Sequence, residues 1–157
     1  MRIPMIVDTD TASDDAVALI MALCAPEVDV KAITVVAGNV SMEKGSRNAR
    51  YTVELCGADV PVHDGGGRPL LREPRPASFF HGEDGLGDQG YPPPRRPAAA
   101  GHAVAVLVEM IRAHPGLTLV TLGPLTNVAL ASLSPRRSLR RSAAVWSWAE
   151  LPARWAT

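Results

Sequence analysis

Four aspartates lie within eight residues near the start of the chain: Asp8, Asp10, Asp14 and Asp15. Residues 3–7 before them and 16–23 after them are apolar, which predicts a turn between a buried strand and a helix. Clustered carboxylates repel each other and are costly to desolvate, so a bound cation would stabilise them. Because only oxygen ligands are present, calcium or magnesium is favoured over zinc. The alternative, a solvated loop with an Asp or Ser helix cap, explains one or two of these acids but not four.

The elements that must position these acids alternate between strands and helices. The first helix is expected to be capped by Ser13 or Asp14 and to end near Cys24, and residues 64–97 form a long loop rich in Gly and Pro. The alternation predicts an α/β fold with a mostly parallel, Rossmann-like sheet flanked by helices. We predict strands at 5–7, 30–36, 60–63 and 117–122, and later helices at 42–56, at 98–113 and from 123–127 to about 133.

Polar residues follow three of these predicted strands. The acid cluster follows the first strand, Asn39 follows the second, and Thr126 and Asn127 follow the last. Ligands of parallel sheets bind at the carboxyl ends of the strands. The three clusters are therefore expected to form a single site.

Composition limits the class of protein. Residues 1–133 carry 11 basic and 15 acidic groups, a net charge of −4, whereas residues 134–157 carry five Arg and one Glu, a net charge of +4. The body has no basic patch that suggests a nucleic-acid partner, and no apolar run reaches the length of a membrane span. Cys24 and Cys56 lie in apolar helical stretches and are expected to be buried. Together with the lack of a secretory leader, they favour the cytoplasm.

Four segments resemble the nucleoside hydrolase family, the inosine-uridine-preferring N-ribohydrolases. The family's opening motif, Asp-Thr-Asp-x-x-x-Asp-Asp-Ala-x-Ala-Leu, is matched in full by residues 8–19, although many members have Pro-Gly where this chain has Thr11-Ala12. Gly38-Asn39 matches a ribose-contacting Asn. Residues 81–87 resemble a flexible loop over the base, and residues 123–127 match a second metal-binding segment.

The resemblance implies a calcium site in this chain. Asp10 and Asp15 would bind Ca²⁺, with the backbone carbonyl of Thr126 as a further ligand. Asp10 would also orient and deprotonate the attacking water. Asp8 is expected to brace the loop by accepting backbone N–H bonds rather than to bind the metal.

The resemblance also implies how a ribonucleoside would be held. Asp14 and Asn39 would bind the ribose hydroxyls, and His81 would lie near the base, the alternative for His81 being a loop histidine in solvent. Asn127 is expected to cap or brace its helix. The implied reaction is hydrolysis of the N-glycosidic bond, as in purine and pyrimidine salvage, through a transition state with positive charge on the sugar. Family members are commonly homo-oligomers.

The resemblance ends after residue 133, which divides the chain into a truncated hydrolase segment, 1–133, and an Arg- and Trp-rich tail, 134–157. One permitted codon choice for residues 145–157, read in a shifted frame, encodes a Met-Gly-Gly segment typical of the family. We therefore expect the tail to be an out-of-frame product and this polypeptide to have little or no activity. The alternative is an evolved basic tail that binds a partner.

Other classes of function were weighed against the hydrolase. A phosphatase of the haloacid dehalogenase type also has an Asp-x-Asp after an apolar strand, but it needs a late Lys, and Lys31 and Lys44 come too early. An EF-hand is excluded because Ala12 and Leu19 stand where ligands belong. A non-catalytic half-domain that binds calcium or nucleoside remains open.

Overall fold

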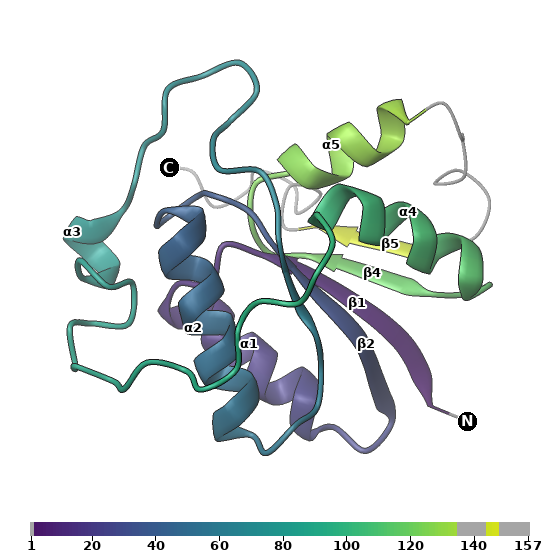
Figure 1. Ribbon diagram of the computed structural model, residues 1–157, viewed down its shortest axis with the longest axis horizontal. Coiled ribbons are helices and arrows are strands. Elements are labelled where there is room, and N and C mark those ends of the chain that lie inside the picture. The colour runs from purple at the N-terminus through teal and green to yellow at the C-terminus, as the bar shows by residue number, and fades with distance from the viewer. Residues whose placement is uncertain (1, 135–143, 148–157) are drawn as a thin grey trace, which may run out of the picture.

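The fold is a five-stranded sheet flanked by helices, seen in a computed structural model that describes residues 2–134 and 144–147 (Figure 1). The sheet order is β3-β2-β1-β4-β5, and each neighbouring pair is parallel. The predicted α/β fold with a parallel sheet is thereby confirmed. The elements are β1 Ile3–Thr9, α1 Ser13–Cys24, β2 Val28–Val35, α2 Met42–Leu55, β3 Val62–Asp64, α3 Ser78–His81, α4 Ala103–Ala113, β4 Thr118–Thr121, α5 Thr126–Leu133 and β5 Ala144–Ser147.

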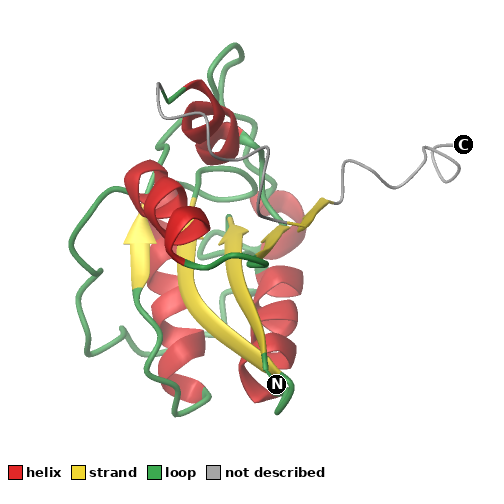
Figure 2. Cartoon of the chain, turned by 90° about the vertical axis from the view of Figure 1, so that its right-hand side faces the viewer, coloured by secondary structure: helices red, strands yellow, loops and turns green. Residues whose placement is uncertain are grey.

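Side chains alternate between the two faces of the sheet, as the pleat of a strand requires. Ile6 of β1 packs in a core with α4 and α5, whereas its neighbour Val7 packs in a second core with α1 and α2. The same alternation separates Ala32 from Ile33 in β2. Figures 1 and 2 show the two helix pairs on opposite faces of the sheet. Burial on both faces explains why the strands are apolar runs rather than alternating ones.

The central position of β1 brings its carboxyl end between two other strand ends. Residues Ile3–Thr9 pair with β2 on one side, and Met5–Asp8 pair with β4 on the other. The amide of Val36 donates to the Thr9 carbonyl at 3.0 Å, and the amide of Leu122 donates to the Asp8 carbonyl at 2.8 Å. The chain segments that leave β1, β2 and β4 are thus tied together where they turn into helices.

Several local expectations are wrong in detail. Ala12, not Ser13 or Asp14, is the residue before α1, and because its methyl side chain accepts no hydrogen bond, no side chain caps this helix. Ser13 is the first residue of the helix, and its hydroxyl bonds His81. The long loop contains the short helix α3, which the sequence did not reveal. The strand β5 was not predicted either, and it pairs with Thr118–Thr121 of β4.

The two cysteines are not the buried residues that were expected. Cys24, at the end of α1, is exposed, and Cys56, just after α2, is half-buried. Both stand where a helix ends, so neither helix carries them onto its apolar face.

Two other expectations concern the chain as a whole. None of the helices in the described part of the chain is both long and apolar enough to cross a membrane. The division at residue 133 and the out-of-frame interpretation of 134–157 fall mostly outside the described residues and stay predictions.

Candidate functional site

The candidate site lies where β1, β2 and β4 end, and it is built around Asp10. Gly38, after β2, comes so close that a Cβ on it would lie 2.0 Å from Asp10 Oδ2 and 2.7 Å from the ring of Pro124, after β4. Only glycine fits there, since real Cβ atoms do not approach other atoms so closely. The three strand ends therefore meet at one point, as the polar clusters in the sequence predicted.

Asp10 is buried, but only one of its two carboxylate oxygens has a hydrogen-bond partner. Its side chain is 3% exposed, and Oδ2 accepts a 2.5 Å hydrogen bond from the amide of Asn39. Its other oxygen, Oδ1, is buried without a hydrogen-bond partner. Because an unpaired buried carboxylate oxygen is costly, this atom is a natural ligand position for a cation.

Asp15 points back from the first turn of α1 towards the end of β1. Its Oδ2 accepts bonds from the Thr9 hydroxyl at 2.6 Å and from the Thr11 amide at 3.1 Å. Burial, with the adjoining Asp10 carboxyl, raises the pKa of Asp15 from its ordinary 3.8 to about 7. Two carboxyls in contact cannot both ionise easily, so the pair favours either a shared proton or a cation.

Asp8 is a brace, as expected, but its partners are side chains rather than backbone amides. Its Oδ1 accepts from the Thr34 hydroxyl at 2.6 Å and from Asn127 Nδ2 at 2.8 Å. Burial raises the pKa of Asp8 to about 6, against the lowering effect of these two bonds. Its Oδ2 is buried without a partner, so the acid cluster holds two unpaired oxygens in all, one each on Asp8 and Asp10.

Asn127 joins separate segments instead of capping its own helix. Beside its bond to Asp8, Nδ2 donates to the Val35 carbonyl at 2.9 Å, and Oδ1 accepts from the Gly66 amide at 2.8 Å. The residue before α5 is Leu125, without a side-chain cap. Asn127 is fully buried, so it links the ends of β1, β2 and β3 from the start of α5.

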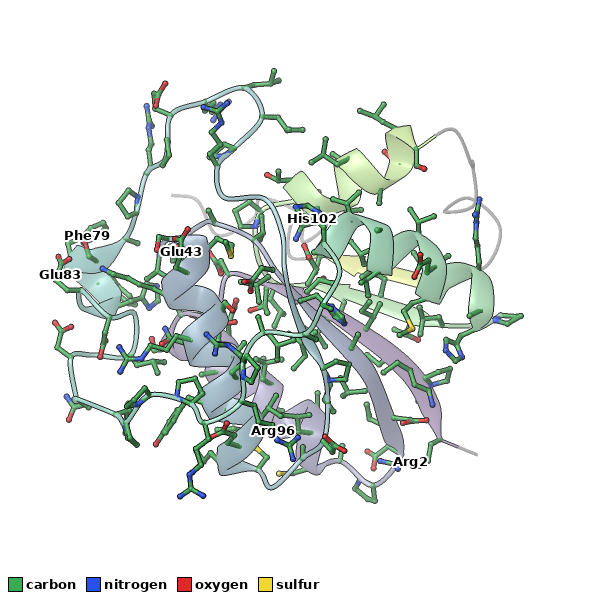
Figure 3. All side chains as sticks on the ribbon, in the orientation of Figure 1. Arg2, Glu43, Phe79, Glu83, Arg96 and His102 are labelled. Atoms are coloured by element: carbon green, nitrogen blue, oxygen red, sulfur yellow. The ribbon has the colours of Figure 1, made fainter. Side chains whose placement is uncertain are left out.

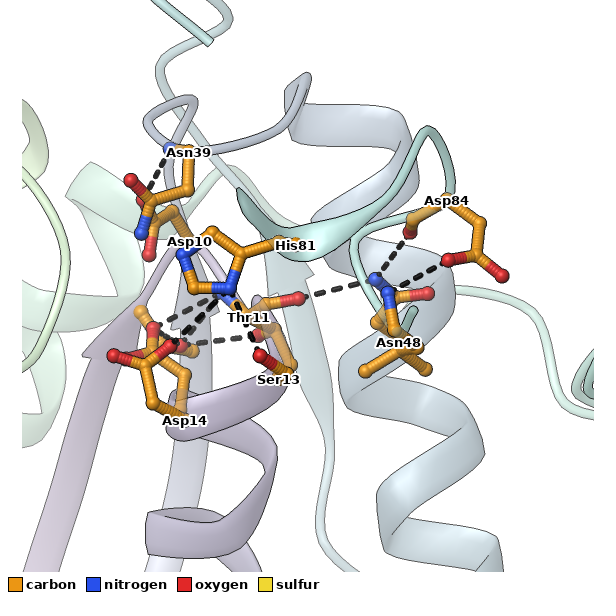
Figure 4. A network of polar contacts seen from close by, with 11 residues as sticks. Asp10, Thr11, Ser13, Asp14, Asn39, Asn48, His81 and Asp84 are labelled. Atoms are coloured by element: carbon orange, nitrogen blue, oxygen red, sulfur yellow. Dashed lines mark hydrogen bonds and ion pairs between the residues drawn. The ribbon is translucent and has the colours of Figure 1, made fainter. Parts of the chain in front are cut away.

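Asp14 and His81 lie close together beside the segment from Asp10 to Asp15, which we call the acid loop (Figure 4). His81 Nδ1 lies 2.8 Å from the Ser13 hydroxyl and 4.0 Å from Asp14 Oδ1. His81 is 7% exposed, which rules out the alternative of a loop histidine in solvent. The Asp14 side chain is 70% exposed and thus accessible to a ligand.

Thr126 begins α5 and is buried beside the turn that contains Pro124. Its amide donates to the Pro124 carbonyl at 2.9 Å, and its side chain packs beside Gly66. This places Thr126 in the turn that contacts Asp10 through Gly38 and Pro124.

A cation would find some of its ligands here but not all of them. Within residues 2–134, no three Asp, Glu, His or Cys side chains converge into a metal site of their own. The unpaired Oδ1 of Asp10 and the Asp10–Asp15 contact fit one hard cation. Because calcium takes about 6–8 oxygens, main-chain carbonyls, water or ligand hydroxyls would have to complete the shell.

A cavity of about 1300 Å³ opens beside Asp10. Asp10 and Asn39 line it from the strand ends, and a Pro-rich stretch of the long loop, 69–76, contributes much of the wall. Of the predicted site residues, all of which the structure describes, Asp14, Asp15, His81 and Thr126 are not in this lining. They lie behind or beside Asp10.

The sequence did not single out Thr9, Thr34 or Asn48, which nevertheless hold the acids in place. Thr9 and Thr34 donate to Asp15 and Asp8, and Asn48 donates to the Thr11 carbonyl. A polar residue inside an apolar strand marks Thr9 and Thr34, and Thr9 also belongs to the opening motif, whereas no local pattern marks Asn48.

Comparison with known proteins gives the family. A family model described as inosine-uridine preferring nucleoside hydrolase matches residues 5–146. The chain is 43% identical, over 131 residues, to the non-specific ribonucleoside hydrolase RihC of Escherichia coli, an alignment that covers 83% of this chain and 43% of that protein.

Two solved structures are similar to this fold. A purine-preferring ribonucleoside hydrolase from Gardnerella vaginalis has a TM-score of 0.84 at 31% identity, covering 92% of this chain and 48% of that one. The plant nucleoside hydrolase PpNRh1 has a TM-score of 0.79 at 38% identity, covering 84% and 43%. The chain thus spans less than half the length of these relatives. The family model, the identities and the fold agree that this chain belongs to the inosine-uridine preferring nucleoside hydrolase family.

Proposed function

We propose that this chain carries the N-terminal part of a hydrolase that cleaves the N-glycosidic bond of ribonucleosides, giving ribose and a free base. One observation carries the proposal. In a member of this family, the buried Asp10 carboxyl faces a large cavity and keeps one oxygen unpaired. An unpaired buried carboxylate at a cavity wall is a group available for binding or proton transfer.

Asp10 and Asp15, with the backbone carbonyl of Thr126, would hold a calcium ion. Support comes from the surroundings of Asp15, whose pKa is raised by burial and by the adjoining Asp10 carboxyl. A calcium ion at this position would lower the pKa of a water molecule and fix its position. Remaining ligands would be water and sugar hydroxyls.

Asp10 and the side chains around it would have different roles toward the substrate. Asp10 would orient the attacking water and accept its proton, and its carboxylate charge would stabilise the positive charge that develops on the sugar. Asp14, which is exposed, and Asn39, which lines the cavity, would bind the ribose hydroxyls. His81 would lie near the base.

We also propose the setting in which this chemistry takes place. The ligand is a small ribonucleoside rather than a nucleic acid, the protein is a homo-oligomer in the cytoplasm, and the reaction serves nucleoside salvage. The relatives' names support the substrate class, since one is called a non-specific ribonucleoside hydrolase and another a purine-preferring ribonucleoside hydrolase.

A second candidate is a non-catalytic half-domain that binds calcium or nucleoside. It is favoured by the site, because Asp10, Asp15 and the cavity wall all lie within the matched segment. Turnover by this polypeptide alone is expected to be slow or absent, because the matched segment corresponds to less than half of the relatives' chains.

A paired assay separates the two candidates. The purified chain is titrated calorimetrically with calcium and with ribose, and ribose release from inosine and uridine is followed with calcium or with EDTA. Slow release that EDTA abolishes supports the hydrolase. Binding of calcium and ribose without release supports the half-domain, and neither binding nor release contradicts both.

A further inference from the structure

Helix α2 faces the acid loop with two small or polar residues one turn apart. A Cβ at Gly45 would lie 2.5 Å from the Asp10 carbonyl oxygen, so the helix backbone comes directly against the loop. Asn48 follows one turn later and is 4% exposed. The helix thereby presents one amide side chain to a loop that carries the acids.

The NH₂ group of Asn48 is shared between two segments far apart in the sequence (Figure 4). Nδ2 donates to the Thr11 carbonyl at 3.1 Å and to the Asp84 carbonyl at 2.9 Å. An amide NH₂ has two hydrogens, so both bonds can exist at the same time. Asn48 therefore connects the acid loop with the loop that follows His81.

Each of these segments is ordered internally, and Asn48 fixes where they stand. Thr11 has a left-handed backbone, with φ of 37°, and its amide donates to Asp15 Oδ2. In the other loop, the Asp84 carboxylate accepts from the amides of Leu86 and Asp88. Asn48 bonds both loops from their buried side, and the Ser13–His81 hydrogen bond joins the same two segments nearer to the candidate site.

We propose that Asn48 is a positioning residue for the candidate site, which holds the acid loop and the 82–88 loop at one relative position. It is not a catalytic residue, since its amide is used by the two carbonyls. The metal-affinity part of this inference rests on the proposed function, whereas the mechanical part rests on the contacts alone. Loss of Asn48 would shift Asp15 through Thr11 and would loosen His81 from Ser13.

Hydrogen–deuterium exchange of the full chain tests the mechanical part. The carbonyls of Thr11 and Asp84 lose their donor in two variants, Asn48→Ala and Asn48→Asp. The aspartate has the same shape as asparagine but donates no hydrogen bond when it is ionised. We expect roughly tenfold faster exchange in both 10–16 and 82–88, the size expected when buried partners are left unpaired. Calcium binding, where the wild type shows it, should weaken about 10- to 100-fold, as for other residues that orient metal ligands.

Two control variants separate positioning from general loosening. Thr52→Ala removes a buried hydroxyl of α2 that bonds only within the helix, to the Asn48 carbonyl at 2.9 Å. Lys44→Ala removes the exposed contacts of α2 to Glu83 and leaves the acid loop untouched. Thr52→Ala should change neither segment, and Lys44→Ala should change 82–88 alone.

The inference is overturned when 10–16 exchanges at the wild-type rate in Asn48→Ala, or when Thr52→Ala accelerates it equally. If neither Asn48 variant folds, the test is hydrogen–deuterium exchange of the wild type at a series of low denaturant concentrations. We then expect residues 10–16 and 82–88 to open together, with the same opening free energy. Different opening free energies for the two segments would contradict the inference. A wild type that binds no calcium argues against the proposed metal site and leaves the exchange result on Asn48 intact.

Discussion

The acid cluster combines two kinds of carboxylate with different environments. Asp8 is held by two side-chain donors and braces the strand ends, whereas Asp10 lines the cavity, accepts one bond from the Asn39 amide and keeps its other oxygen buried without a partner. Asp14 stands in the open on the first turn of α1. The four acids therefore differ in environment although they are close in sequence, which is a matter of burial rather than of residue type.

The buried Asp15 gives a pH dependence that can be tested in calcium-free protein. Its pKa is about 7 in the folded chain and 3.8 when unfolded, so between these values the folded state binds the extra proton. The free energy of unfolding should then fall as pH rises from 4 to 7. Asn in place of Asp15 does not titrate, so Asp15→Asn should gain stability relative to wild type over that range.

Urea unfolding of both proteins at pH 4, 5.5 and 7.5, with EDTA present, measures this difference. Glu27→Gln, which removes an exposed carboxyl at the other end of the sheet, serves as the control and should show no such trend. A constant difference between Asp15→Asn and wild type at all three pH values would contradict the assigned pKa.

The hydrogen-bond partners of the site residues were harder to predict from the sequence than the candidate site residues themselves. The acids, Asn39 and Thr126 are marked by their positions after strands, and local spacing was enough to find them. The donors to Asp8 come from 26 and 119 residues away, so the sequence does not show that they meet. Asn127 was expected to cap or brace its own helix, and it instead joins α5 to Asp8, Val35 and Gly66.

At the scale of elements, two apolar cores hold the sheet between its helix pairs. The first four strands and the long helices were predictable because apolar runs alternate with helical periods, whereas β5 was not. The short α3 carries no such signal, since Ser78–His81 is a single turn whose Phe79 and Phe80 are exposed. Phe79 projects at the outer edge of the molecule (Figure 3).

Leu107 of α4 should be a main support of the core on its face of the sheet. It is 1% exposed and packs with Ile6, Ile111 and Leu119. Leu107→Ala should lower the free energy of unfolding by about 2–5 kcal/mol through lost burial and a cavity. Leu133→Ala, at a side chain that is 76% exposed, should change it by under about 0.5 kcal/mol. Similar losses in both variants, measured by urea unfolding, would refute this packing.

In the whole molecule, the candidate site lies in a chain that spans less than half of its relatives' length. The wall of the cavity built from 69–76 and the strand ends is present, and so are Asp10 and Asn39. The fold and the family were predictable from four short motifs in order. The position of the long loop over the strand ends was not, because that loop has no periodic pattern.

Calorimetric titration of calcium into wild type, Asp10→Asn and Glu27→Gln tests the central claim most directly. Both variants lose one negative charge, but Asp10 lines the cavity and carries an unpaired buried oxygen, whereas Glu27 is exposed and lies away from the site. We predict one calcium per chain for wild type and Glu27→Gln, and loss of binding in Asp10→Asn. Equal calcium binding by Asp10→Asn and wild type would contradict it.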